Sequence, residues 1–462
     1  MKTILKNVAL NGNKTNILIS NGLFEDCNLP DSALESIEAQ NLQSTETQNM
    51  QSTDAQNLQS PDAQALASPG AQTLASPGAQ TLASPGAQTL TSPGAQYGEY
   101  QIVDLEGTAI LPSFYNTHNH AAMTLLRGYG DDTNLETWLH KYIWPYEAKL
   151  TAADIRKGSQ WAVEEMLATG TTFFNDMYFE IEQTMDLVER AGMRMCVGIT
   201  IMDLHTPQQH REKVELIKSW KDRAEGRITA AVAPHAIYTV SKEYLQEAAQ
   251  LSREYGLKLH IHVAETKAEV ADSIKNFGTT PVRYLESLGV LGENVIAAHC
   301  VHVDEEEWDI LARRGVTVAH CPCSNMKLGS GRFPYELAIK SGARITLATD
   351  GASSNNNLDM REEMKFAALL AKVAGNPELL PAECVLKWAT RNGAEAFGIN
   401  GGTIENGAVA DAILLNLSHR SFLAGHNLVS DWVYAADSSA IAATLCNGQL
   451  IYPAAAVSAA RR

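Results

Sequence analysis

The sequence predicts an α/β protein in which a (β/α)8, TIM-like barrel over residues 109–399 is joined to a small β-sandwich domain. Three observations support this fold class. Eight short apolar segments alternate with amphipathic segments through the middle of the chain. Strand-like segments gather near both ends, so we expect both termini to build the smaller domain. Several histidines directly follow the central apolar segments, at the face where barrels of this kind place their active sites.

The barrel prediction depends on the order of these segments. Amphipathic stretches such as DIRKGSQWAVEEMLAT and SKEYLQEAAQLSREYG lie between the apolar ones, as crossover helices would. Buried strands that alternate with helices predict a parallel sheet closed into a barrel. The expected strands are, in order, AILPSF, TTFFNDM, RMCVGIT, ITAAVAPH, KLHIHVA, VIAAHC, TVAHC and RITLATD.

The β-sandwich domain is expected from residues 1–108 and 400–462. On the N-terminal side, NILISNGLFED and YQIVDLEGTAILP have strand patterns. On the C-terminal side, GAVADAILLNL, DWVYAA and TLCNGQLIY have them too. Two β-rich ends around an α/β middle favour one domain that both ends share.

A low-complexity insert interrupts the N-terminal part. Residues 39–94 form an octapeptide array that ends in AQALASPG, AQTLASPG, AQTLASPG and AQTLTSPG. One leucine or methionine per copy offers too little apolar surface to offset the entropy of ordering the chain. We therefore expect a disordered surface loop, with a binding or spacing element as the alternative.

The composition excludes several classes of partner. The 462 residues carry a formal net charge of −17 and no run rich in lysine or arginine, which argues against nucleic acid. No apolar run approaches the roughly 18 residues that a membrane-spanning helix needs. The seven cysteines are few for a chain of this length and odd in number, and the first residues lack a signal-peptide pattern. These features favour reduced thiols and a cytoplasmic location.

Three histidines and one aspartate at the ends of expected strands have the character of a metal site. His118 and His120 lie in NTHNH, His262 in LHIHVAET and Asp350 in TLATDG. Side chains two residues apart on a strand point to the same side, so the first pair can reach one metal ion. Such a set leaves room for water on a transition metal. The structural alternatives are a hydrogen-bonded histidine pair near a turn and an aspartate that caps a helix.

Other polar residues accompany this set. Glu265 follows one expected ligand by three residues, where a carboxylate can move protons; the alternative is a solvated carboxylate at a helix start. His299 would be a fifth ligand or would orient the water. We expect His260 to pack inside the barrel. The HCPC string that begins at His320 is interpreted as a barrel-strand histidine with two buried thiols rather than as a zinc site.

Together these segments resemble the amidohydrolase superfamily. Within it they are most similar to the group that contains 5-methylthioadenosine/S-adenosylhomocysteine deaminase, chlorohydrolases and guanine deaminase. The strings that carry the resemblance are LPSFYNTHNHAAMTLLRGYGDD, ETWLHKYIWPYEAKLT, APHAIYTVS, LHIHVAET, VIAAHCVHVDEEE, HCPCSNMKLGSG and TLATDGASSNNNLDM.

The resemblance implies specific roles for residues of this chain. A single divalent metal ion, zinc before others, would be held by His118, His120, His262 and Asp350. Substrate contacts would come from Glu147, His235, Glu265, Asp350 and Trp138. The family also uses arginines on the loop after the third strand. Arg211 is the candidate for one of them, and no second arginine matches.

The resemblance also implies a reaction. The metal would activate water, Asp350 would accept the water proton, Glu265 would protonate a ring nitrogen, and His299 would orient the water. The expected activity is metal-dependent deamination of an adenosine-type nucleoside, such as 5′-methylthioadenosine or S-adenosylhomocysteine, to the inosyl product and ammonia. One alternative is a related amidohydrolase acting on guanine, cytosine or a triazine. Another is a catalytically silent barrel that serves as a binding scaffold. The expected partner is a small-molecule nucleoside or heterocycle, and the sequence leaves open whether the chain forms a homo-oligomer.

Overall fold

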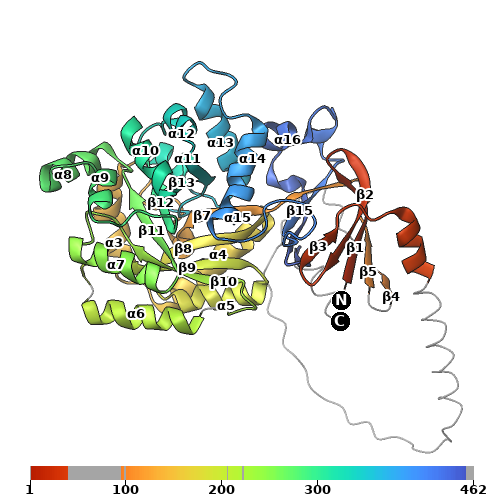
Figure 1. The fold of residues 1–462 in the computed structure, drawn as a ribbon, viewed down its shortest axis with the longest axis horizontal. Helices are drawn as coiled ribbons and strands as arrows, with labels where there is room; N and C mark the ends of the chain where they lie inside the picture. The colour runs from red at the N-terminus through yellow and green to blue at the C-terminus, as the bar shows by residue number, and fades with distance from the viewer. Residues whose placement is uncertain (1, 40–94, 98–99, 205, 221–222, 454–462) are drawn as a thin grey trace, which may run out of the picture.

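The computed structural model of the chain describes residues 2–39, 95–97, 100–204, 206–220 and 223–453 (Figure 1). Apart from its first residue, the predicted octapeptide insert 39–94 lies outside the described residues. No helix in the described ranges is long and apolar enough to cross a membrane.

Eight parallel strands form the predicted barrel. They pair in sequence order, each with its neighbour along the chain. The Thr117 hydroxyl lies 2.7 Å from that of Thr346, which brings the last strand against the first. The (β/α)8 prediction is therefore confirmed. The strands are β7 (Phe114–Asn119), β8 (Thr171–Tyr178), β9 (Arg194–Ile201), β10 (Ile228–Pro234), β11 (Lys258–Val263), β12 (Val295–His299), β13 (Thr317–His320) and β14 (Arg344–Leu347).

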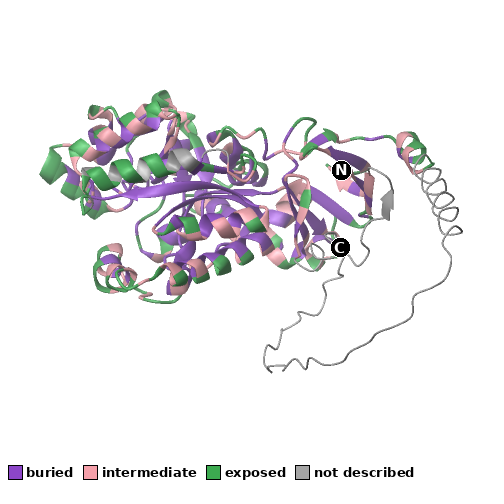
Figure 2. Cartoon of the chain, turned by 90° about the horizontal axis from the view of Figure 1, so that it is seen from below, coloured by how far each residue is buried: buried purple, intermediate pink, exposed green. Residues whose placement is uncertain are grey.

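Helices surround the strands, with their exposed sides facing outward (Figure 2). Strands β8 and β9 consist of buried residues throughout, as expected where helices cover a parallel sheet. The helices that follow strands are α4 (Ala152–Ala168), α5 (Ile181–Ala191), α6 (Pro207–Trp220), α7 (Lys242–Glu254), α8 (Lys267–Phe277), α9 (Pro281–Ser287), α10 (Glu305–Arg314), α11 (Pro322–Lys327), α12 (Tyr335–Ser341), α13 (Met360–Lys372), α14 (Ala382–Ala389) and α15 (Arg391–Ala396).

The first barrel strand lies later in the chain than predicted. The segment AILPSF is divided between two sheets. Residues Thr108–Pro112 form β6, which pairs antiparallel with a C-terminal strand in the smaller domain. Proline lacks the N–H that continues a ladder, which suits the end of β6 at Pro112. Because β7 starts only at Phe114, His118 lies within the strand and His120 directly follows it.

Strands from both termini share one mixed sheet, as the prediction of a joint β domain requires. The sheet branches at β1, which pairs with β2, β5 and β6. N-terminal Val8 and Phe24 pack in the same apolar core as C-terminal Leu414 and Leu445. The strands are β1 (Lys2–Leu10), β2 (Asn13–Ser20), β3 (Leu23–Asp26), β4 (Ala95–Tyr97), β5 (Tyr100–Asp104), β6, β15 (Ala412–Asn416), β16 (Ile441–Cys446) and β17 (Gln449–Tyr452).

The strand predicted for DWVYAA is wrong. Residues Asp431–Ala435 form a short π-helical turn, and the Ala436 N–H donates to the Asp431 carbonyl at 2.8 Å. The Asn427 side chain caps the turn that precedes it, which starts a helix where the apolar pattern alone suggests a strand. The Trp432 ring is buried and stacks on Phe114 of β7, with centroids 6.2 Å apart. The apolar residues of this segment thus cover the barrel.

A buried ionic network joins the barrel to the mixed sheet. Asp411, directly before β15, accepts hydrogen bonds from Tyr115 of β7 at 3.0 Å and from Arg194 of β9 at 2.7 Å. It also accepts the backbone N–H of Asn447 at 2.7 Å. The side chains of Asp411 and Arg194 are 0% and 8% exposed. Loss of one partner from such a pair leaves a buried charge without compensation.

We expect Asp411→Ala to destabilise the protein by about 3–5 kcal/mol, because it leaves the Arg194 guanidinium buried and unpaired. Urea unfolding measures this change. The matched control is Arg314→Ala, which removes an ion pair with Glu286 at the surface and should leave the unfolding midpoint nearly unchanged. Equal midpoints for the two variants would contradict the structural role of this network.

Candidate active site

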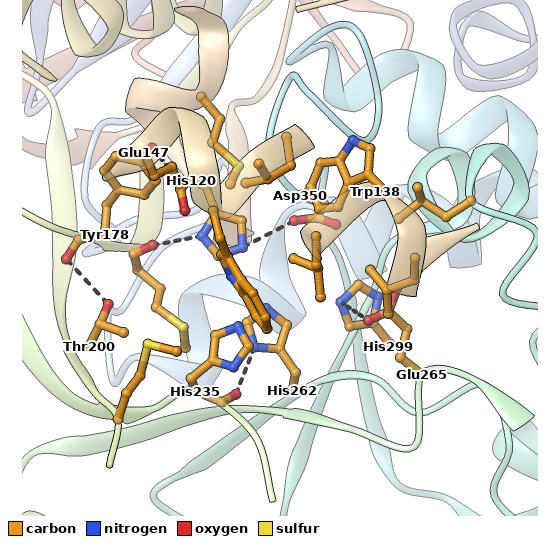
Figure 3. A pocket seen from close by; sticks show the side chains of 18 of the residues that line it. His120, Trp138, Glu147, Tyr178, Thr200, His235, His262, Glu265, His299 and Asp350 are labelled. Carbon is orange, nitrogen blue, oxygen red and sulfur yellow. Dashed lines mark hydrogen bonds and ion pairs between the residues drawn. The ribbon is translucent and has the colours of Figure 1, made fainter. Parts of the chain in front are cut away.

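A cavity with an empty volume of about 650 Å³, part of it at the open mouth, lies at the carboxyl ends of the barrel strands. Figure 3 shows Glu147 and Tyr178 at one side of it and Glu265 with His299 at the other. The polar lining of the cavity includes His120, Glu147, His235, His262, Glu265, His299 and Asp350, and its apolar lining includes Met123, Leu135, Leu139, Ile143, Phe179, Met202 and Leu328.

The structure brings together the four residues predicted as metal ligands. Asp350 Oδ1 lies 3.3 Å from His118 Nε2 and 3.2 Å from His120 Nε2. The His262 ring lies 4.8 Å from the His118 ring, measured between centroids. His118 is common to two groups, one with His120 and Asp350 and one with His262 and His299, whose candidate ligand atoms lie within 4.8 Å of one another.

Hydrogen bonds on the Nδ1 side of the His120 and His262 rings leave Nε2 of each ring directed at the proposed metal site. Nδ1 of His120 lies 2.6 Å from the Met177 carbonyl, and Nδ1 of His262 lies 2.7 Å from the His235 carbonyl. Since a carbonyl only accepts, each Nδ1 carries a proton, and each Nε2 is the nitrogen that can bind a metal. The Nε2 of His118 is buried and has no hydrogen-bond partner among the described residues. Three imidazoles and a carboxylate fit a zinc ion.

The ionisation of these groups favours a cation. Burial lowers the pKa of His118 to about 4 and holds that of His262 well below its ordinary value, so both rings are neutral at pH 7. Burial also acts to lower the pKa of His120, but Asp350 outweighs it and raises that pKa to about 9. Burial raises the pKa of Asp350, and the two histidines overcome this and hold it well below its usual range. A divalent cation would take the place of the proton on His120.

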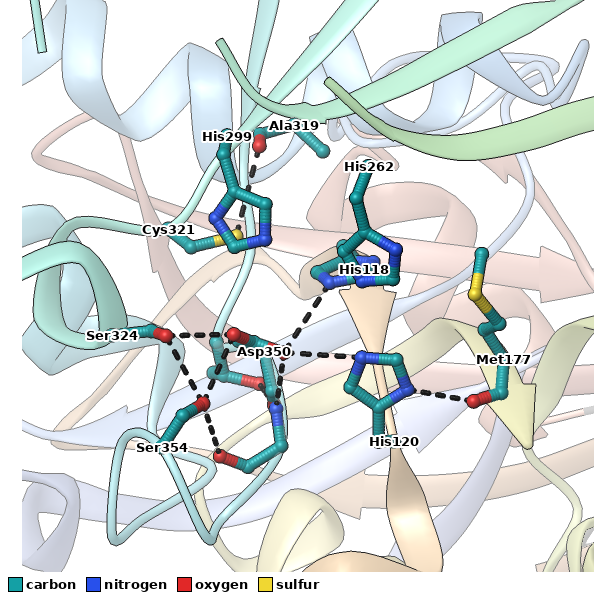
Figure 4. A network of polar contacts seen from close by, with 12 residues as sticks. His118, His120, Met177, His262, His299, Ala319, Cys321, Ser324, Asp350 and Ser354 are labelled. Carbon is teal, nitrogen blue, oxygen red and sulfur yellow. Dashed lines mark hydrogen bonds and ion pairs between the residues drawn. The ribbon is translucent and has the colours of Figure 1, made fainter. Parts of the chain in front are cut away.

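Asp350 is oriented from behind by two serines (Figure 4). The hydroxyls of Ser324 and Ser354 donate to its Oδ2 at 2.6 and 2.9 Å. Its Oδ1 accepts the N–H of Gly351 at 2.8 Å and faces the histidines. The sequence reasoning missed both serines, although Ser324 lies in the string HCPCSN and Ser354 four residues after Asp350.

Glu265 and His299 lie beside the metal set. Glu265 accepts a hydrogen bond from Ser330 at 3.2 Å, and its other oxygen lies 3.7 Å from His299 Nε2. His299 Nδ1 lies 2.8 Å from the side-chain oxygen of Asn325. Burial is the main cause of the raised pKa of Glu265. A buried carboxyl group of this kind can hold a proton nearer neutral pH than an exposed one.

Three strand ends at the mouth have left-handed backbone. The φ angles are 50° at Ala264, 73° at His299 and 62° at Asp350. For residues other than glycine this conformation costs on the order of 1–3 kcal/mol each, and it is concentrated at functional sites. The strain turns the chain at the ends of β11, β12 and β14, where the polar residues enter the cavity.

Trp138 and Glu147 enter the cavity from the segment after β7. Trp138 starts a π-helical turn, Trp138–Ile143, and Glu147 ends α3, Trp144–Glu147. Glu147 accepts a hydrogen bond from Tyr178 at 2.8 Å, and burial is the main cause of its raised pKa. The Trp138 indole N–H is buried without a partner in the described part of the chain. His235 also lines the cavity, and burial lowers its pKa to about 3.

Arg211 is not brought to the cavity. It lies on α6 with a side chain that is 61% exposed, 3.9 Å from Glu247 of α7. The outer face of an amphipathic barrel helix is solvated, which explains its position. His260 is buried as predicted, and its Nε2 lies 2.8 Å from Nδ1 of His118. His320 lies in β13 beside two buried free thiols, also as predicted.

Comparison with known proteins identifies the family. Residues 109–451 match the model of the amidohydrolase family. The chain belongs to this family. It is 45% identical over 356 residues to a 5′-deoxyadenosine deaminase of Methanosphaera stadtmanae, which covers 76% of this chain and 84% of that protein.

Two further similarities extend this result. A 5-methylthioadenosine/S-adenosylhomocysteine deaminase of Archaeoglobus fulgidus is 45% identical over 353 residues, or 76% of this chain and 84% of that protein. The crystal structure of a zinc-bound adenosine deaminase from Xanthomonas campestris superimposes with a TM-score of 0.79 at 29% identity, over 100% of this chain and 96% of that one.

Proposed function

We propose that this amidohydrolase is a zinc-dependent deaminase that hydrolyses the 6-amino group of adenosine-type nucleosides and releases ammonia. The observation that carries the proposal is the position of Glu265 and His299 beside a buried set of three histidines and an aspartate, at one cavity. Two relatives that are 45% identical are named 5′-deoxyadenosine deaminase and 5-methylthioadenosine/S-adenosylhomocysteine deaminase. A silent scaffold would have no need to retain these buried ionisable groups, which are costly to bury.

The residues that would hold zinc are His118, His120, His262 and Asp350. When bound, the metal lowers the pKa of water from 15.7 to about 7 and so supplies the nucleophile at neutral pH.

The remaining groups move protons and orient the reactants. Asp350 would accept a proton from the attacking water. Its Oδ1 faces the histidines and serves this role, because Ser324 and Ser354 donate hydrogen bonds to its Oδ2. Glu265, with its raised pKa, delivers a proton to the ring nitrogen next to the carbon under attack. His299 lies 3.7 Å from that carboxylate and orients the water. Asp350 returns the water proton to the amino group, the C–N bond breaks and ammonia leaves, while the attacking oxygen gives its remaining proton to Glu265 and becomes the carbonyl of the product.

The rest of the cavity suits a nucleoside with a small, uncharged 5′ group. Trp138 offers a ring face, and Glu147 can accept hydrogen bonds from ribose hydroxyls. The wall beyond them is apolar, with Leu139, Phe179 and Met202 among its residues. No lysine or arginine occurs among the described residues that line the cavity. The carboxylate of a homocysteinyl group would therefore lack a lysine or arginine partner among these lining residues.

Elemental analysis tests the metal site. We expect one zinc ion per chain, and His262→Ala should lose most of it because a ligand is removed. The control is His320→Ala, in the HCPC string, which should keep the metal because His320 faces Tyr335 instead. Metal lost from the His320 variant but kept by the His262 variant would place the site elsewhere.

Glu265→Gln should lower kcat by about 10²–10⁴-fold, the usual contribution of a positioned acid or base. The variant keeps its size and burial, so the zinc content and the melting temperature should stay close to wild type. Steady-state ammonia release measures the rate. Turnover near that of the wild type would show that another group transfers the proton.

A substrate panel tests the nucleoside assignment. We expect kcat/KM for 5′-deoxyadenosine and 5′-methylthioadenosine to exceed that for S-adenosylhomocysteine, because the described wall offers no cation. All adenosine nucleosides should exceed guanine and cytosine by at least about tenfold, or about 1.4 kcal/mol of transition-state preference. If a free base is favoured by that factor, the nucleoside assignment fails. If S-adenosylhomocysteine is the best of the nucleosides, the nucleoside assignment stands, and only the inference that the apolar wall favours a small, uncharged 5′ group fails.

A further inference from the structure

Glu269 is a buried carboxylate to which the proposed reaction gives no task. It lies in the first turn of α8 and is 8% exposed. Its two oxygens accept the backbone N–H groups of Ala264, at 2.8 Å, and of Glu265, at 2.7 Å. Burial raises the pKa of this carboxyl group to about 7, and the two amides act against that rise. Burial of a charged carboxylate costs free energy of folding, so a structural or functional role is expected for Glu269.

Other helices in the same barrel use this position differently. In α10, Glu307 accepts the N–H of the N-cap residue Asp304 at 3.1 Å, and in α4 Asp154 accepts that of the N-cap residue Thr151 at 3.0 Å. Both are capping boxes, which close a helix start on itself.

In α8 only half of the capping box is present. The N-cap residue Thr266 accepts the N–H of Glu269 at 3.1 Å, in the usual way. The Glu269 side chain extends past Thr266 to the two preceding amides instead. One of these amides belongs to Glu265, so the helix start is attached to the backbone of the residue proposed to move the proton.

The backbone at Ala264 has a strained conformation that hydrogen bonds can stabilise. Ala264 has a φ of 50°, in the left-handed region, between the end of β11 and Glu265. Its carbonyl accepts N–H groups from Val301 and His302 at 3.1 and 2.9 Å. With Glu269 on the N–H side, the Ala264 peptide groups are held from both directions. Two hydrogen bonds to one carboxylate are strong and directional.

We propose that Glu269 is a positioning residue for catalysis, which fixes the Ala264–Glu265 backbone so that the Glu265 carboxylate faces His299 and the cavity. The proposal rests on the proposed function, in which Glu265 transfers the proton. A displacement of about 1 Å in a reacting group can cost about 100-fold in rate. Loss of Glu269 should therefore slow the reaction without weakening substrate binding.

The test compares Glu269→Gln with Glu307→Gln. Both variants replace a buried helix-start glutamate that accepts at least one backbone N–H, but only Glu269 contacts the Glu265 backbone. Glutamine presents an NH2 group to one of the two amides, which breaks that hydrogen bond. We expect kcat for 5′-methylthioadenosine to fall about 10- to 100-fold in Glu269→Gln, with KM within about twofold and the zinc content unchanged. Glu307→Gln should keep the wild-type kcat even if its melting temperature falls.

A second comparison isolates the route through Glu265. In a Glu265→Gln background, adding Glu269→Gln should change kcat little, because the two residues act as one unit. Equal kcat losses in the Glu269 and Glu307 variants, or additive losses in the double variant, would overturn the proposal. If Glu269→Gln does not fold, Glu269→Asp decides: its shorter carboxylate should lower kcat with full zinc content, and an unchanged kcat overturns the proposal. A wild-type enzyme that deaminates no nucleoside would instead refute the proposed function.

Discussion

One contact between the first barrel strand and the segment that follows the last one both closes the barrel and builds the active site. The Asp350 N–H donates to the His118 carbonyl at 3.1 Å, and the side chains of the same two residues meet at 3.3 Å. The carboxylate can only lie there if the sheet is closed, and the imidazoles can only be buried against it if a cation or proton compensates the charge. Fold and chemistry therefore share one constraint.

The polar groups at the mouth are held by partners outside the cavity. Ser324 and Ser354 hold Asp350, Asn325 holds His299, and Tyr178 holds Glu147. Because such partners fix both direction and tautomer, the reactive groups do not depend on a ligand for their orientation. Helix α11, with Ser324 and Asn325, supports two of these three groups, Asp350 and His299, which gives the HCPCSN string a role that zinc binding would not explain.

Active-site residues that lie at the ends of barrel strands could be predicted from the sequence. Residues whose position depends on the packing of loops and helices could not. The four proposed ligands converge because the carboxyl ends of barrel strands must meet. Ser330, Asn325 and Glu269 reach the site from loops and helices, whose register against a distant strand has no local pattern. Strand β1 was not predicted, because KTILKNVAL mixes lysines with its apolar residues and has no clear alternation. The π-helical turn at Asp431–Ala435 has strand-like residues, but a cap and a stacked tryptophan decide its form.

The mixed sheet places a particular demand on synthesis of the chain. Strand β6 directly precedes the first barrel strand, and its partner β15 follows the last barrel helix, so the two paired strands are separated in the sequence by the whole barrel. Translation at about 5–20 residues per second needs roughly 15–60 s for the roughly 300 residues between them. During that time the edge of β6 has no β15 to pair with, and an open strand edge can pair with another chain. In the nascent chain this edge therefore stays open to pairing with another chain until β15 has been synthesised.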